Sequence, residues 1–182
     1  MHKKTLCLAL SLAAAATFAH ADDWTPKQFF VSAGGVTLHS TLSATAGVVW
    51  PWRWSYGWFG GEWTGYTEGF VSVMNAKELG GGHEAFTQIG AVPMFRNRFD
   101  GGRSPMFFEL GVGATYFDSI YHTYRKTFST RFQFYDTVGV GMSFGPQRES
   151  EIGLRVLHES NAGIRHPNPG ENFLLLRYAR NF

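Results

Sequence analysis

The chain has 182 residues, a formal net charge of +2, a mean hydropathy of −0.15 and a single cysteine. This length suits one domain. The near-balanced charge excludes a general nucleic-acid binder, which would carry a basic excess, and the lone cysteine excludes a disulfide framework.

The first 21 residues have the features of a cleaved secretory signal peptide. Lys3 and Lys4 precede an apolar run over residues 6–18, and small residues occupy the cleavage positions up to Ala21. The run is too short to cross a bilayer as a helix. Cleavage would leave residues 22–182 as a single domain and remove two lysines, which takes the charge from +2 to 0. Cys7 would leave with the signal, so the mature chain would have no disulfide and no thiol chemistry.

The composition of the remaining chain favours β-strands. The sequence holds 17 Phe, 7 Tyr and 6 Trp together with 22 Gly. No segment after the signal reaches the roughly 18 consecutive apolar residues expected of a membrane helix. Aromatic and glycine enrichment without such a run is typical of alternating strands.

Eight strands are predicted in chain order. They cover residues 28–40, 41–54, 62–74, 84–99, 105–117, 130–145, 152–161 and 171–182. The second ends in Trp50, Trp52 and Trp54, which share a face and fit an aromatic girdle at a membrane–water boundary. A tryptophan-rich core edge or sugar platform is the alternative. Pro93 interrupts the fourth strand and is tolerable only at a bulge or an unpaired position.

An even number of strands, joined alternately by short turns and longer loops, predicts an eight-stranded antiparallel up-and-down transmembrane β-barrel of the bacterial outer membrane. The competing fold is an exported soluble barrel of the lipocalin sort. The faces opposite the apolar ones carry Glu109, Gln133 and Arg155, which suits the polar lumen of a membrane barrel.

The seventh strand has polar residues on its apolar face. Ile152, Leu154 and Val156 alternate along it and are followed by His158 and Ser160. If both termini lie in the periplasm, this strand ascends, so the pair lies at the outer surface. A lipid-facing pair at that level contacts lipopolysaccharide, and the expected location is therefore the outer membrane of a bacterial cell.

A histidine and a serine on one face can form the core of a hydrolase. Serine becomes a nucleophile when a base takes its proton, and histidine is the usual base. Alternate residues of a strand are about 6.6 Å apart, which a leaning imidazole can span. A third group must fix the imidazole tautomer, and an oxyanion hole is required. The alternative is an interfacial histidine beside a serine that ends the strand.

The segment from His158 to Gly170, HESNAGIRHPNPG, resembles the signature of the outer-membrane lipid A 3-O-deacylases of the PagL type. The resemblance is dense from His158 to the C-terminus and only architectural before it. It implies hydrolysis of the ester-linked 3-hydroxyacyl chain at position 3 of lipid A by a Ser-His-Glu triad, with no metal and no cofactor. It also implies Ser160 as nucleophile, His158 as base, Asn161 and Gly163 as oxyanion or substrate contacts, and a possible homodimer.

The third member of the triad has two candidates. The family's glutamate follows the loop after one intervening residue, whereas Glu171 follows Gly170 directly and an ungapped match places Asn172 there. Alternation also puts Asn172 on the same face as Leu174. Glu171 is preferred because a carboxylate stabilises an imidazolium better, with Asn172 as the alternative histidine orienter.

The remaining candidates concern binding and rival functions. Arg165 and His166 lie in the last loop and could contact a lipid A phosphate, although a solvated loop position is the plainer interpretation. Neither His83 nor His122 shows a partner at metal-ligand spacing in the sequence, and His39 does not either. The rival functions are a non-catalytic barrel serving structure or adhesion, and a barrel that transfers an acyl chain to an acceptor other than water.

Overall fold

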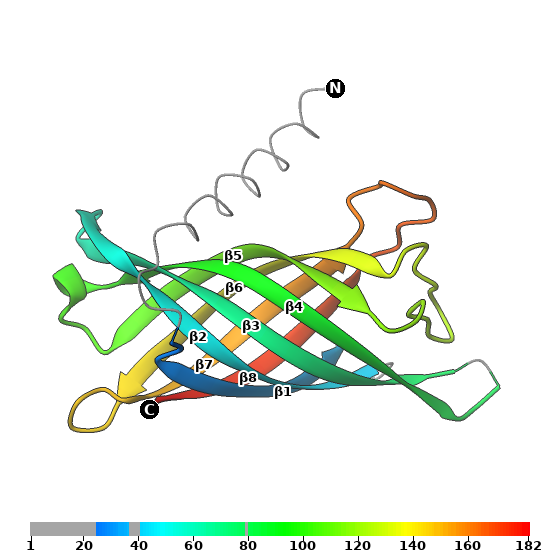
Figure 1. Cartoon of the computed structure of the whole chain (residues 1–182), viewed down its shortest axis with the longest axis horizontal. Helices are drawn as coiled ribbons and strands as arrows, with labels where there is room; N and C mark the ends of the chain where they lie inside the picture. The colour runs from blue at the N-terminus through cyan, green and yellow to red at the C-terminus, as the bar shows by residue number, and fades with distance from the viewer. Residues whose placement is uncertain (1–24, 37–40, 79) are drawn as a thin grey trace.

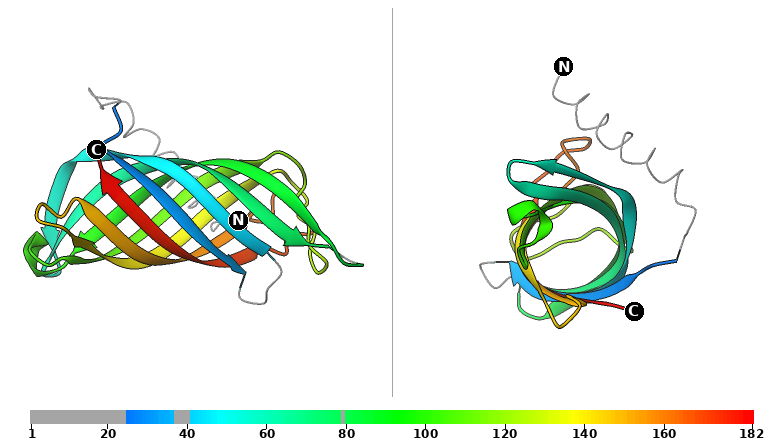
Figure 2. Two further views of the ribbon diagram at one scale, coloured as in Figure 1. Left: turned by 90° about the horizontal axis from the view of Figure 1, so that it is seen from below. Right: turned by 90° about the vertical axis from the view of Figure 1, so that its left-hand side faces the viewer.

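The computed structural model describes residues 25–36, 41–78 and 80–182, which form one closed barrel of eight antiparallel strands (Figures 1 and 2). Each strand pairs with the next, and β1 pairs with β8. The strands are β1 (Gln28–Val36), β2 (Thr41–Trp58), β3 (Gly61–Lys77), β4 (His83–Arg98), β5 (Met106–Phe117), β6 (Phe132–Phe144), β7 (Ser150–Ser160) and β8 (Glu171–Asn181). A short 3-10 turn, η2 (Asp100–Gly102), follows β4. The predicted signal peptide lies outside the described residues, as does His39.

All eight predicted strands are confirmed, although β2 and β3 are longer than expected. β2 continues through Tyr56 to Trp58 and β3 continues to Lys77. The aromatic residues of β2 keep alternating beyond Trp54, so the strand does not stop where its aliphatic residues end. Pro93 lies where the β4–β5 ladder is interrupted between Ala91 and Met94, which is the kind of unpaired position expected for a proline.

The outer wall of the barrel is apolar. On β7 the side chains of Ile152, Leu154 and Val156 are exposed, and on β8 those of Leu174 and Leu176 are exposed. A closed sheet leaves no unpaired edge, so such a wall can face lipid. Among the described residues, no helix is long and apolar enough to cross a bilayer.

The tryptophans of β2 lie over glycines of the neighbouring strand. A Cβ atom on Gly65 would lie 2.0 Å from Cε3 of Trp52, and one on Gly69 would lie 2.8 Å from Cζ3 of Trp50. Trp52 also donates a hydrogen bond to Thr67 at 3.0 Å. The large rings therefore lie on the wall because the residues beneath them have no side chain.

The barrel interior contains a network of buried ion pairs. Arg155 pairs with Glu68 and Glu109, both at 2.7 Å, and Arg96 pairs with Glu109 at 2.9 Å. Arg96 also pairs with Glu151 at 2.6 Å. The predicted inward orientation of Glu109, Gln133 and Arg155 is confirmed, since all three are buried. Buried charges of this kind are tolerated because they are paired and hydrogen-bonded.

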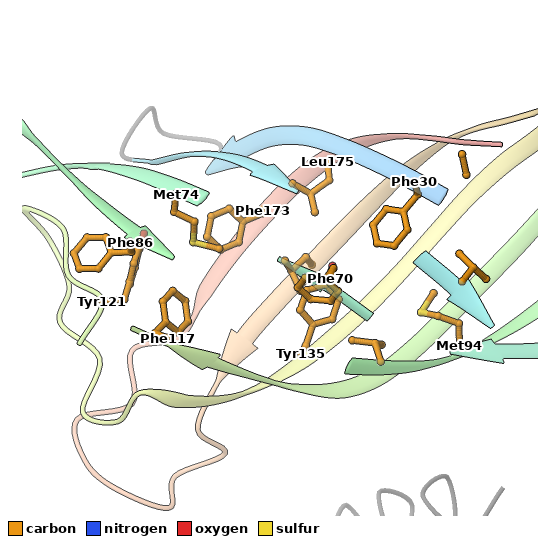
Figure 3. Close-up of a cluster of buried hydrophobic side chains, with 14 of the residues drawn as sticks. Phe30, Phe70, Met74, Phe86, Met94, Phe117, Tyr121, Tyr135, Phe173 and Leu175 are labelled. Atoms are coloured by element: carbon orange, nitrogen blue, oxygen red, sulfur yellow. The ribbon is translucent and has the colours of Figure 1, made fainter. Parts of the chain in front are cut away.

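An apolar cluster fills the interior nearer the long loops. Phe86, Phe117, Phe173 and Tyr121 lie together there (Figure 3). Tyr121 comes from the β5–β6 loop and accepts or donates a 2.6 Å hydrogen bond with Thr41. Burial raises the pKa of the Tyr121 phenol, so the group stays neutral. This cluster anchors the β5–β6 loop over the end of the barrel.

The connections divide between the two ends of the barrel. The β5–β6 loop (118–131) and the β7–β8 loop (161–170) lie together at one end (Figure 1). The turns between β4 and β5 and between β6 and β7 lie at the other end, with the C-terminus. The end of β7 that carries His158 and Ser160 is therefore the end with the long loops.

Candidate active site

His158 and Ser160 lie near the loop end of β7, on the outer wall. The alternation that exposes Ile152, Leu154 and Val156 continues to both residues, whereas Glu159 between them is buried in the interior. His158 is half-buried, and Ser160 retains 9% exposure. The predicted placement of this pair on the apolar wall matches the structure.

A hydrogen bond fixes the imidazole of His158. Its Nδ1 lies 2.7 Å from Oδ1 of Asn172, the residue directly opposite on β8. When Nδ1–H donates to this amide oxygen, the neutral imidazole has its free lone pair on Nε2. That tautomer is the one a general base needs to accept a proton from a serine.

The structure corrects the expectation that Glu171 orients His158. Strand alternation turns Glu171 into the barrel, where it is buried and pairs with Nζ of Lys126 at 2.8 Å. Asn172 faces outward with Leu174 and holds the imidazole. Strand alternation therefore predicts the residue that contacts the histidine, whereas the greater basicity of a carboxylate does not.

The turn after Ser160 is held by the side chain of Asn161. This side chain is buried; its Nδ2 donates to Oγ of Ser129 and to the carbonyl of Arg165, and its Oδ1 accepts from N of Gly163 at 2.9 Å. Asn161 and Gly163 were both predicted as oxyanion or substrate contacts. In the structure, Nδ2 of Asn161 and the backbone N–H of Gly163 donate to acceptors within the two long loops. The backbone N–H of Ala162 lies 3.5 Å from Oγ of Ser160.

The other predicted binding residues lie at the surface of the β7–β8 loop. The side chains of Arg165 and His166 are exposed, while the carbonyl of Arg165 accepts hydrogen bonds from Ser129 and Asn161. Because Ser129 belongs to the β5–β6 loop, these bonds tie the two long loops together beside Ser160.

Two further residues near the site had little or no signal in the sequence. Asp136 lies directly opposite His158 on β6, on the outer wall. It was visible only as the one acidic residue on an otherwise apolar face. Lys126, which contacts Glu171, belongs to an irregular loop whose sequence has no periodicity to place it.

His122 has an acidic partner that the sequence did not reveal. Its Nε2 lies 3.1 Å from Oε2 of Glu84. With Glu78 these residues form a group whose potential ligand atoms lie within 4.8 Å of one another. The strand β4 brings Glu84 to a loop that follows it by more than thirty residues, and sequence spacing could not show this.

A closed barrel of eight antiparallel strands with an apolar outer wall defines a β-barrel protein of the bacterial outer membrane. Residues 40–181 match the family described as Lipid A 3-O-deacylase (PagL). The chain belongs to this family, and it is accordingly an ester hydrolase.

Two curated relatives and one solved structure are similar to the chain. The lipid A deacylase PagL of Bordetella bronchiseptica is 36% identical over 165 residues, which cover 82% of this chain and 84% of that protein. The lipid A deacylase PagL of Pseudomonas aeruginosa is 28% identical over 141 residues, covering 76% and 78%. A crystal structure of the outer membrane enzyme PagL superimposes with a TM-score of 0.70 at 23% identity, covering 85% of this chain and 99% of that one, and bears on the fold alone.

Proposed function

We propose that the protein hydrolyses the ester-linked 3-hydroxyacyl chain at position 3 of lipid A in the outer leaflet, with Ser160 as nucleophile and His158 as general base. The observation that carries this proposal is the 2.7 Å contact between His158 Nδ1 and Asn172 Oδ1 on the apolar wall. It prepares Nε2 to accept a proton at a position that lipid can reach. A polar pair on a lipid-facing wall needs such a functional reason.

In the acylation step, Oγ of Ser160 attacks the ester carbonyl carbon while Nε2 of His158 takes the serine proton. The tetrahedral intermediate collapses when the imidazolium returns this proton to the departing sugar oxygen. The C–O bond to the sugar breaks, and the acyl chain remains on Ser160. Water then attacks the acyl-enzyme with His158 again as base, which releases the 3-hydroxy fatty acid and restores the serine.

Asn172 supplies the third group in this proposal. Its amide oxygen fixes the tautomer and the orientation of the imidazole, as asparagine does in papain-like cysteine proteases. A neutral amide stabilises the imidazolium less than a carboxylate does. Asp136, opposite His158 on the other side, places a carboxyl group beside the same ring.

The backbone N–H of Ala162 is the proposed oxyanion donor. It is directed to within 3.5 Å of Oγ of Ser160, and Ala162 and Gly163 both have positive φ, which turns the chain sharply after the nucleophile. One such donor contributes roughly 3–4 kcal/mol to transition-state stabilisation. Asn161 serves this arrangement by holding the turn, and exposed Arg165 is the proposed contact for a lipid A phosphate.

The test uses refolded protein in detergent micelles that contain phospholipid and purified lipopolysaccharide, and mass spectrometry of both the released fatty acid and the lipid A. The wild-type protein should release a 3-hydroxy fatty acid, whereas Ser160→Ala and His158→Asn should release none while remaining heat-modifiable, folded barrels. Release by folded Ser160→Ala at the wild-type rate would contradict the proposed chemistry. An added acyl chain on the lipid would identify the transferase, and unchanged lipid would identify the non-catalytic barrel.

A further inference from the structure

The β5–β6 loop reaches across to the first residues of β8. Nζ of Lys126 donates to the carbonyl of Gly170 and to Oε1 of Glu171, both at 2.8 Å. The lysine is itself held by a tight turn, because its backbone N–H donates to Oγ1 of Thr123 and its carbonyl accepts from the N–H of Thr123. Lys126, which this turn holds in place, therefore binds two consecutive residues, Gly170 and Glu171, at the start of β8.

The residue that Lys126 neutralises lies beside a second buried acid. Glu171 is directly opposite Glu159 across the β7–β8 ladder, and both side chains are buried in the interior. A buried carboxylate is costly unless it is paired with a cation. In the described part of the chain, the ion pair of Glu171 is made by Lys126. Without this cation, the carboxylate of Glu171 would be buried in the interior and uncompensated.

The residues on either side of Glu171 adjoin the imidazole of His158. A Cβ atom on Gly170 would lie 2.7 Å from Cε1 of His158, so this glycine forms one wall of the imidazole site. Asn172, which accepts the hydrogen bond from Nδ1, follows Glu171 directly. Because successive side chains of a strand point to opposite faces, the inward position of Glu171 determines the outward position of Asn172.

We propose that Lys126 is a positioning residue for the hydrolysis, an inference that rests on the function proposed above. By binding Gly170 and Glu171 at once, it fixes the start of β8 and so keeps Asn172 on the imidazole of His158. Glu171 contributes to this alignment from inside the barrel through its ion pair with Lys126, and it does not contact the histidine. The structure thereby assigns the buried acid next to the site a role in alignment.

The consequence for catalysis differs from that of a substrate contact. A displacement of about 1 Å in a catalytic group can cost roughly 100-fold in rate. Lys126→Met should therefore lower kcat by roughly ten- to a hundredfold and leave KM within about twofold, since no contact to lipid is removed. Lys126→Arg, which keeps the cation, should recover most of kcat.

A double variant separates alignment from direct binding of a lipid phosphate. In Lys126→Met the carboxylate of Glu171 is left buried without its cation, and adding Glu171→Gln removes that charge. The double variant should regain part of the kcat that Lys126→Met loses, because the buried charge is gone although the contact to Gly170 is still missing. Arg125→Met is the matched control, because it removes the adjacent exposed cation without touching residues 170–171, and it should match the wild type.

The measurements are kcat and KM for 3-hydroxy fatty acid release from lipopolysaccharide by folded, heat-modifiable protein. An increase in KM at constant kcat for Lys126→Met, or a double variant no better than Lys126→Met, would overturn the positioning role. Ser160→Ala is assayed in parallel. If it is inactive while Lys126→Met keeps full kcat, only this inference fails; if Ser160→Ala is active, the proposed function fails instead.

Discussion

At the scale of single residues, His158 is held by a neutral amide and the nearby glutamate faces the other way. The hydrogen bond from Nδ1 ends on Asn172, and Glu171 is bound to Lys126 inside the barrel. Fixing the tautomer accounts for much of the contribution that a histidine's partner makes, because replacing the acid of a serine protease by an amide that stabilises the wrong tautomer costs about 10⁴-fold. In this site the amide oxygen supports the productive tautomer.

The two candidates for the third residue make opposite predictions. Asn172→Leu removes the acceptor for Nδ1–H and should lower kcat by roughly a hundredfold or more. Glu171→Gln keeps an oxygen that Lys126 can bind and should lower kcat only a few-fold. Steady-state fatty acid release from lipopolysaccharide measures both. A severe loss in Glu171→Gln with near-normal Asn172→Leu would show that the carboxylate, and not the amide, orients the histidine.

The sequence could place His158, Ser160 and Asn172 on one face because alternation along a strand depends on neighbouring residues alone. It could not reveal the partners of Glu171, since the side chain that neutralises it lies 45 residues earlier in an irregular loop. Asp136 was recognisable as an exception on its strand, but its position opposite His158 depends on the β6–β7 register. Contacts between distant segments follow from the register of the closed barrel, which local pattern does not specify.

At the scale of elements, the start of β8 forms a wall of the imidazole site. Gly170 has a φ of 59°, in the left-handed region, and approaches the ring of His158 so closely that a methyl group would collide with it. Both the backbone conformation and the close approach call for glycine at this position. The start of β8 therefore contributes to the site in two ways. Gly170 leaves room for the imidazole ring, and Asn172 accepts the hydrogen bond from it.

Gly170→Ala should displace the imidazole and lower kcat by at least tenfold, because Cβ would lie 2.7 Å from Cε1 of His158. Gly60→Ala is the control for backbone strain. Gly60 has a φ of 69° in the β2–β3 turn, but its Cβ would meet open space. Kinetics of fatty acid release distinguish the two variants. Equal activity of both would mean that the contact between Gly170 and the ring has no bearing on catalysis.

At the scale of the whole molecule, paired charges buried in the interior connect strands that are far apart in the sequence. Glu68 binds Arg155 and Arg177, each at 2.7 Å, and these three residues lie on β3, β7 and β8. The network thus connects strands on different sides of the barrel. The sequence predicted acidic and basic residues inside, but the pairing of residues 87 and 109 positions apart required the closed sheet.

Glu68→Ala should destabilise the folded barrel by about 3–5 kcal/mol, because it leaves two buried arginines without a shared partner. The exposed pair of Arg103 and Asp100 provides the control, and Arg103→Ala should change stability by about 0–1 kcal/mol. Equilibrium unfolding in urea, followed by tryptophan fluorescence and heat-modifiable mobility, measures both. Equal stability of the two variants would show that the interior network does not hold the barrel together.

We propose that a serine on the outside of this barrel removes an acyl chain from lipid A. Mass spectrometry of lipid A from cells that express the protein tests it most directly, with Ser160→Ala expressed to the same level in the outer membrane. Wild-type cells should lose one 3-hydroxyacyl group from lipid A, and Ser160→Ala cells should keep it. Loss of the same group in both strains, or unchanged lipid A in both, would contradict this role of Ser160.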